Sequence, residues 1–144
     1  MLVAACYLAD VNWRTHPDYR AQACFVTATQ ANLGGLTHEE RVFLAVALAY
    51  RYKGAKEALR SEPAAELLSV EARLKAEAVG KALRLGAMIS GAAQNVLSEC
   101  RLVRGEETLS LSFKKAHATL MSGPVQRRLT SLASTLKLTP ELTN

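Results

Sequence analysis

The segment from Leu8 to Arg20, LADVNWRTHPDYR, carries the densest set of chemically capable side chains in the sequence. It holds two carboxylates, Asp10 and Asp18, one imidazole, His16, and the only tryptophan. Carboxylates and imidazoles are the usual ligands of divalent metals, and arginine binds phosphate oxygens. Metal binding and phosphate binding are therefore the first two kinds of chemistry to weigh.

A metal site needs several His or carboxylate ligands that converge. The candidates are Asp10, His16, Asp18 and His38, with His117 far away in the sequence. Their spacing matches no strong metal-binding motif. His16 can instead cap its turn, Asp18 can cap the following helix, and His38 lies on an ordinary exposed first turn. We predict no metal site.

The patterns of nucleophilic catalysis and of nucleotide-binding loops are also missing. No serine lies in a glycine elbow, and Gly34-Gly35 has the context of a helix end. Cys6, Cys24 and Cys100 are odd in number and lie among apolar neighbours, which is typical of reduced thiols packed as small hydrophobes in a cytosolic protein. We expect no disulfide and no catalytic residue.

The basic residues are more suggestive. The formal net charge is +5, a value that attracts polyanions but is common in proteins that bind none. A recurring set lies on or near the same elements: Arg14, Arg20, Arg41, Arg51, Lys53 and Arg84. Because guanidinium groups bind phosphate oxygens bidentately, such a face can hold a chain of phosphates. The alternative is a solvated basic face without a ligand.

Helices must position these groups. A chain of 144 residues has the length of one domain, and 49% hydrophobic residues with only four prolines favour helices over strands. The apolar run from Leu2 to Leu8 predicts a buried helix, so Asp10 lies where a core helix surfaces. Pro17 disfavours helical geometry at His16, which predicts a tight connection over residues 12–16.

Apolar periodicity and capping residues predict the rest of the fold. Helices are expected over residues 18–31, 37–54, 55–61, 64–68, from Ser69 onward, and 122–136. Thr37 and Glu40 form a capping box that opens the central helix. Gly80, Gly86 and Gly91 interrupt the long helix and predict close helix approach or a kink. Cys100–Arg104 and Thr108–Phe113 predict a β-hairpin, and Thr139-Pro140 ends the last helix.

Several short segments of the sequence resemble those of one known family. AACYLADVNWRTHPDYRAQ contains the signature W-R-x-H-P-[DE]-Y-R, and GKALRLGAMISG, LVRGEETLSLSF and VQRRLTSLASTL follow in family order. Together they resemble the C-terminal domain of the exopolyphosphatase and guanosine pentaphosphate phosphatase family. The resemblance covers nearly the whole chain.

That family domain is in turn similar to the His-Asp (HD) phosphohydrolase superfamily, in which an adjacent His and Asp at a helix end bind a divalent metal. The corresponding residues here are Ala9 and Asp10. Alanine has no lone pair to donate, so the resemblance implies a degenerate HD position and argues against hydrolysis by this domain. The expected fold is mainly α: a compact HD-like helical domain with one small β-hairpin near the C-terminus.

The resemblance implies an accessory domain, residues 1–144, that is a fragment of a longer exopolyphosphatase-like chain. Catalysis, with Mg as cofactor, would belong to upstream actin-like ATPase-fold domains that remove terminal phosphate from inorganic polyphosphate or guanosine pentaphosphate. This domain would need no cofactor, would help to bind polyphosphate and would contribute to a homodimer. Its implied polyphosphate-binding residues are Arg14, His16, Arg20, Arg41, Arg51, Lys53 and Arg84.

Two other functions stay open. One is a self-sufficient metal-dependent HD-type phosphohydrolase, against which Ala9 argues. The other is a nucleic-acid or alarmone-binding module, favoured by the basic charge but weakened by the lack of a recognition-helix motif, a zinc finger or aromatic stacking platforms. No signal peptide or membrane anchor is indicated, so we expect a cytoplasmic protein without specific nucleic-acid partners.

Asp10 also raises a structural question, because an ionised carboxylate at the edge of a core needs a cation or several donors. The candidate cations are Arg14, Arg20, Arg41 and Arg84, and the candidate donors are the backbone amides of residues 12–14. The alternative is that Asp10 faces water.

Overall fold

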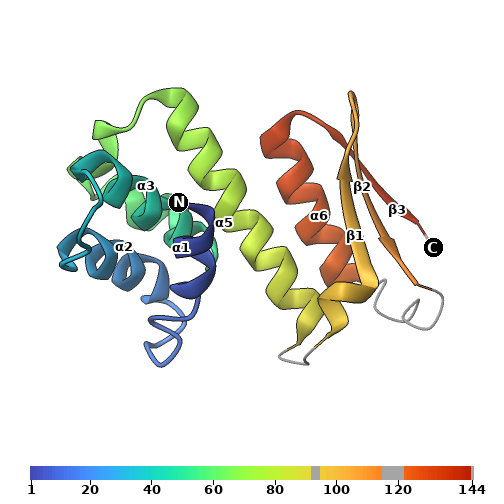
Figure 1. Ribbon diagram of the computed structural model, residues 1–144, viewed down its shortest axis with the longest axis horizontal. Helices are drawn as coiled ribbons and strands as arrows, with labels where there is room; N and C mark the ends of the chain where they lie inside the picture. The colour runs from blue at the N-terminus through green and yellow to red at the C-terminus, as the bar shows by residue number, and fades with distance from the viewer. Residues whose placement is uncertain (92–94, 115–121, 144) are drawn as a thin grey trace. The chain divides into compact units, whose positions relative to one another are not determined.

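The computed structural model describes residues 1–91, 95–114 and 122–143 (Figure 1). Contacts within the chain group these residues into two units, Met1–Leu83 and Arg84–Asn144, and the boundary falls inside the long helix α5 (Val70–Ser90). Each unit has buried hydrophobic residues of its own. The expectation of a single domain over residues 1–144 stays a prediction.

The first unit is built around helix α3. Its elements are α1 (Leu2–Tyr7), α2 (Arg20–Gln30), α3 (His38–Tyr50), α4 (Ala55–Arg60), the 3₁₀ helix η1 (Pro63–Leu67) and the first part of α5. Every residue of α3 from Leu44 to Ala49 is buried, and α2 packs along it. The predicted capping box is confirmed, since Glu40 N donates to Thr37 Oγ1 at 3.2 Å and Thr37 N donates to Glu40 Oε2 at 2.8 Å.

Helix α1 differs from its prediction. Ala5 is its one buried residue, whereas Leu2, Val3 and Tyr7 are exposed, Tyr7 to 86%. Cys6 is exposed too, so the expectation that this thiol packs as a small hydrophobe is wrong. The reason is geometric: a helix of six residues presents one narrow face to α3, and a continuous apolar run necessarily places the remainder outward.

Gly80 lies where α5 and α3 come into contact. An added Cβ at Gly80 would be 2.2 Å from Ala47 O and 2.5 Å from Tyr50 Cβ, so only glycine fits. The prediction of close helix approach is therefore confirmed at this position. At Gly86 close approach is wrong, because the nearest atom to an added Cβ is Leu97 Cδ2 at 3.9 Å, an ordinary van der Waals distance, and the alternative of a kink stays a prediction. Gly91 ends the helix region with a φ of +50°.

The second unit packs a helix on a small sheet. It contains η2 (Val96–Glu99), β1 (Cys100–Arg104), β2 (Thr108–Phe113), α6 (Gly123–Leu136) and β3 (Thr139–Thr143). The predicted hairpin is confirmed, with β1 antiparallel to β2 and Leu102 opposite Leu111. Leu111 and its neighbours two positions away alternate inward along β2, and α6 covers the sheet with Leu129 and Leu132 buried (Figure 1).

Strand β3 was not expected. The last helix does end before Thr139, with Lys137 as a left-handed cap, but the chain then pairs in parallel with β2 and makes the sheet order β1-β2-β3. TPELT is short and half polar, and it contains a proline that lacks an N–H donor. An edge strand tolerates a proline, so the composition of residues 139–143 does not predict that they form a strand.

The described residues confirm a mainly α fold, because they form six α-helices and one three-stranded sheet. In these same residues, none of the helices combines the length and the apolar character that crossing a membrane requires.

Candidate functional site

The corner between α1 and α2 is a series of tight turns. Val11 N donates to Leu8 O at 3.1 Å, Trp13 N to Asp10 O at 3.1 Å, and Thr15 N to Asn12 O at 3.1 Å. The turns therefore begin at Leu8, four residues before the predicted connection. Asn12 Nδ2 ties the corner to α2 by donating to Thr27 Oγ1 at 2.9 Å.

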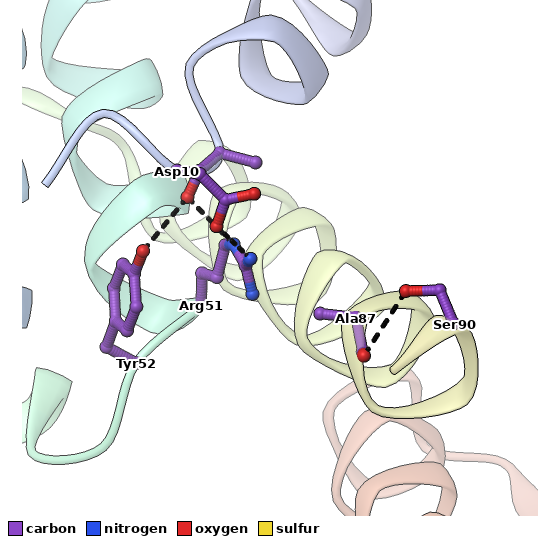
Figure 2. Close-up of polar contacts among 6 residues, drawn as sticks. Asp10, Arg51, Tyr52, Ala87 and Ser90 are labelled. Atoms are coloured by element: carbon purple, nitrogen blue, oxygen red, sulfur yellow. Dashed lines mark hydrogen bonds and ion pairs between the residues drawn. The ribbon is translucent and has the colours of Figure 1, made fainter. Parts of the chain in front are cut away.

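Asp10 is paired with Arg51, the residue that caps the C-terminal end of α3 (Figure 2). The Arg51 guanidinium donates through Nη2 to Asp10 Oδ1 and through Nε to Ala9 O at 2.8 Å. Tyr52 adds a hydrogen bond from its hydroxyl to the same Ala9 carbonyl at 3.2 Å. The Arg51 side chain is 13% exposed and that of Asp10 is 67% exposed.

This arrangement corrects the choice of cation. An arginine does pair with Asp10, but the four candidates Arg14, Arg20, Arg41 and Arg84 are wrong. The amide of Trp13 bonds the Asp10 backbone carbonyl rather than its carboxylate. The alternative that Asp10 faces water holds for most of its side chain. It is the arginine that is desolvated and held by the corner.

Aromatic rings order the corner arginines. The Arg51 and Arg20 guanidinium carbons lie 5.3 Å and 5.8 Å from the Tyr52 ring centroid, and that of Arg14 lies 5.2 Å from the Trp13 centroid. Arg20 Nε also donates to Thr15 O at 2.8 Å. Cation–π contact and hydrogen bonding thus restrict the orientation of these side chains.

His16 and Asp18 form a local pair on the surface. The Asp18 amide donates to His16 Nδ1 at 3.4 Å, and Asp18 Oδ2 lies 3.7 Å from the same nitrogen. The turn-capping interpretation of His16 is therefore supported. Helix α2 begins at Arg20 with Tyr19 as its N-cap and no side-chain cap, so Asp18 does not cap it.

Cys24 lies under the corner and is completely buried. Burial raises the pKa of its thiol, and a hydrogen bond with Asn12 only partly opposes that rise. The thiol therefore stays protonated at neutral pH and is a packing group, as expected from the sequence. All three cysteines are free.

The model of the family described as "Exopolyphosphatase, C-terminal" matches residues 1–140. The chain belongs to this family. The resemblance inferred from its short sequence segments is therefore confirmed. A search of curated proteins gives no match to the chain.

In this exopolyphosphatase C-terminal domain, the position of Ala9 and Asp10 does not fit a divalent metal. Ala9 offers only its carbonyl, which accepts from Arg51 and Tyr52, and the Asp10 carboxylate already bonds a guanidinium. Among residues 1–91, 95–114 and 122–143, no three His, Cys, Asp or Glu side chains are grouped so that they could hold a metal. His117 lies outside the described residues.

The structure brings together part of the predicted phosphate-binding set. Arg14, His16, Arg20 and Arg51 belong to the corner, and the exposed Lys53 follows Tyr52 directly. Arg41 lies ten positions before Arg51 on α3, roughly 15 Å along the helix axis, with its Nε buried and without a partner. Arg84 belongs to the second unit.

Tyr52 was not predicted from the sequence. The available signal was its position directly after Arg51, at the end of the apolar run of α3.

Proposed function

We propose that this domain binds inorganic polyphosphate on behalf of an exopolyphosphatase-like enzyme and does not itself hydrolyse it. Family membership supports the link to exopolyphosphatase. The observation that carries the binding role is the corner, where Arg20 and Arg51 both lie against the Tyr52 ring and the exposed Arg14 and Lys53 flank these residues in the sequence. Residues 8–20 and 51–53 together hold four basic side chains and two carboxylates, which is a formal net charge of +2.

The corner cations have different roles in this proposal. In this proposal Arg14, Lys53 and His16, which are all exposed, supply direct contacts to phosphate oxygens. Arg51 is committed to Ala9 and Asp10, so it shapes the corner and adds positive potential. Arg20, fixed by Thr15 O and the Tyr52 ring, keeps further guanidinium donors for an oxyanion.

The chemical step belongs, in this proposal, to upstream actin-like ATPase-fold domains of the parent enzyme, with Mg as their cofactor. The domain described here presents the polymer to that site and contributes to dimer contacts in a cytoplasmic enzyme. Guanosine pentaphosphate, whose phosphates carry the same oxyanions, is a second substrate of the parent.

Calorimetric titration of the chain with long-chain polyphosphate tests the binding role. Arg14→Glu should weaken binding several-fold and flatten its salt dependence, because reversing a charge releases fewer counterions. Arg104→Glu, at an exposed position of β1, is the matched control and should leave the affinity nearly unchanged. Equal losses in both variants, or none in either, would show that the corner is not the binding surface.

A second candidate, single-stranded nucleic acid, is favoured by one observation. Trp13 is 58% exposed and lies beside Arg14, which is the aromatic platform that the sequence did not indicate. Base stacking predicts that Trp13→Ala weakens binding of a single-stranded oligonucleotide more than binding of polyphosphate, which has no rings. A greater loss for polyphosphate would exclude stacking as the basis of recognition.

A further inference from the structure

A second basic feature lies on another side of the same α3 end. A cavity of about 250 Å³ opens between α3, α4, η1 and α5, and its charged lining residues are all cations: Lys56, Arg60 and Arg73. Val46, Leu59 and Ala65 supply its apolar wall, and Tyr50 completes the lining. We call this cavity the α4 pocket.

The three cations are available to a ligand. Within the part of the chain that the structure describes, none of them pairs with a carboxylate. Arg73 is anchored at the pocket by a hydrogen bond from Nη2 to Ala65 O at 2.7 Å, which occupies one of its five N–H donors. Lys56 and Arg60 are four residues apart and therefore share a face of α4. Like charges at this spacing disfavour the helix, and an anion between them would relieve the repulsion.

Tyr50 keeps the remaining polar wall neutral. Its hydroxyl donates to the Glu77 carboxylate, and burial together with the charge of Glu77 raises the pKa of Tyr50 to about 12. Glu77 is itself paired with Lys81 at 2.6 Å. Glu57 also raises the pKa of Tyr50 through its charge, but neither Glu57 nor Glu77 lines the pocket. The charged side chains that line the pocket itself are therefore the three cations Lys56, Arg60 and Arg73.

We infer that the α4 pocket binds a phosphate oxyanion through Lys56, Arg60 and Arg73. Lysine and arginine converging on a cavity of this size suit a compact anion, since cavities for larger organic ligands are generally about 300 Å³ or more. Tyr50 is the last residue of α3 and Arg51 is its C-cap in helical geometry, so their side chains diverge by about 100° around the helix axis and the pocket is separate from the corner. The inference does not depend on polyphosphate binding at the corner.

Isothermal calorimetry of the chain with orthophosphate, tripolyphosphate and sulfate tests this inference. Arg60→Ala should weaken orthophosphate binding about tenfold, because a charge-assisted hydrogen bond is lost. Lys56→Ala combined with Arg60→Ala should abolish it, whereas Arg104→Ala, on β1, should change it less than twofold. Tighter binding of tripolyphosphate than orthophosphate identifies a chain end as the natural occupant, and equal binding identifies free phosphate.

Folding of the variants is checked by circular dichroism, and Arg60→Lys, which retains the charge, should recover most of the affinity. An unchanged orthophosphate affinity in the double variant, an equal loss in Arg104→Ala, or the absence of any binding heat for the unmodified chain would overturn the inference. Arg14→Glu should affect long-chain polyphosphate but not orthophosphate. Failure of the pocket and failure of the corner are therefore distinguishable.

Discussion

Two polar clusters flank the C-terminal end of α3, and they differ in which partner is buried. In the corner, Arg51 is largely buried but Asp10 is mostly in water. On the α5 side, Glu77 and Lys81 are both largely buried, at 14% and 18% exposure, and Tyr50 bonds to Glu77 beside Gly80. Electrostatic stabilisation increases as water is excluded, so the α5 cluster should dominate stability and the corner should remain adaptable for binding.

Gly80→Ala should give the largest loss of stability. The added methyl group would collide with Ala47 O at 2.2 Å and with Tyr50 Cβ at 2.5 Å. Overpacking against backbone atoms that cannot move independently should cost about 3 kcal/mol of unfolding free energy, measured by urea denaturation. Gly86→Ala is the matched control within α5; it should be neutral or stabilising by up to about 1 kcal/mol, because helix propensity improves. Similar losses at both glycines would disprove the close contact.

Glu77→Gln should give the second largest loss of unfolding free energy. It leaves the Lys81 ammonium in a poorly solvated site without its carboxylate, and the expected loss of unfolding free energy is about 2 kcal/mol. The control is Glu71→Gln, which breaks an i,i+4 pair with Lys75 of the same kind on the exposed part of α5 and should cause no measurable change. If the two variants behave alike, burial does not distinguish these pairs.

The two clusters should contribute differently to the stability of the protein at alkaline pH, because each contains a tyrosine with a raised pKa. The pKa of Tyr50 is raised to about 12, above its unfolded value near 10, so its contribution is complete below about pH 10 and is lost as pH rises towards 12. The pKa of Tyr52 is also raised by burial, in the same direction. Tyr50→Phe should therefore flatten the alkaline decline of stability more than Tyr52→Phe does. The reverse order, followed by denaturation between pH 9 and 12, would contradict the comparison.

Asp10→Asn should produce the smallest change. Since the carboxylate is mostly exposed, its removal should cost roughly 0.5 kcal/mol, whereas Arg51→Met should cost about 1 to 2 kcal/mol by leaving the Ala9 carbonyl with fewer donors. Urea denaturation of both variants checks this order. A loss of 3 kcal/mol or more for Asp10→Asn would mean that the pair is buried in solution.

Local patterns in the sequence predicted much of the fold. The Thr37–Glu40 capping box, the hairpin, the long helix opened by Ser69 and the close approach at Gly80 all depend on residue type and short spacing. Strand β3 depends instead on a parallel partner, residues 108–112, distant in the chain. The exposure of α1 likewise follows from tertiary packing, which an apolar run does not specify.

The site was predictable as a segment but not as a set of contacts. The signature words located Ala9, Asp10 and the surrounding basic residues. The partner of Asp10 lies 41 residues away, and any arginine of the basic set could have met the chemical need. Predicting Arg51 as the partner of Asp10 would require knowing that the C-terminal end of α3 lies at the corner.

The most direct test of the central claim uses the fluorescence of Trp13, the only tryptophan, which lies on the proposed binding surface beside Arg14. Titration with long-chain polyphosphate should give a saturable change in emission that 1 M salt reverses and that needs no divalent metal. The same solution should release no phosphate. A change that requires added Mn²⁺ and is accompanied by phosphate release would contradict the account and restore the metal-dependent hydrolase.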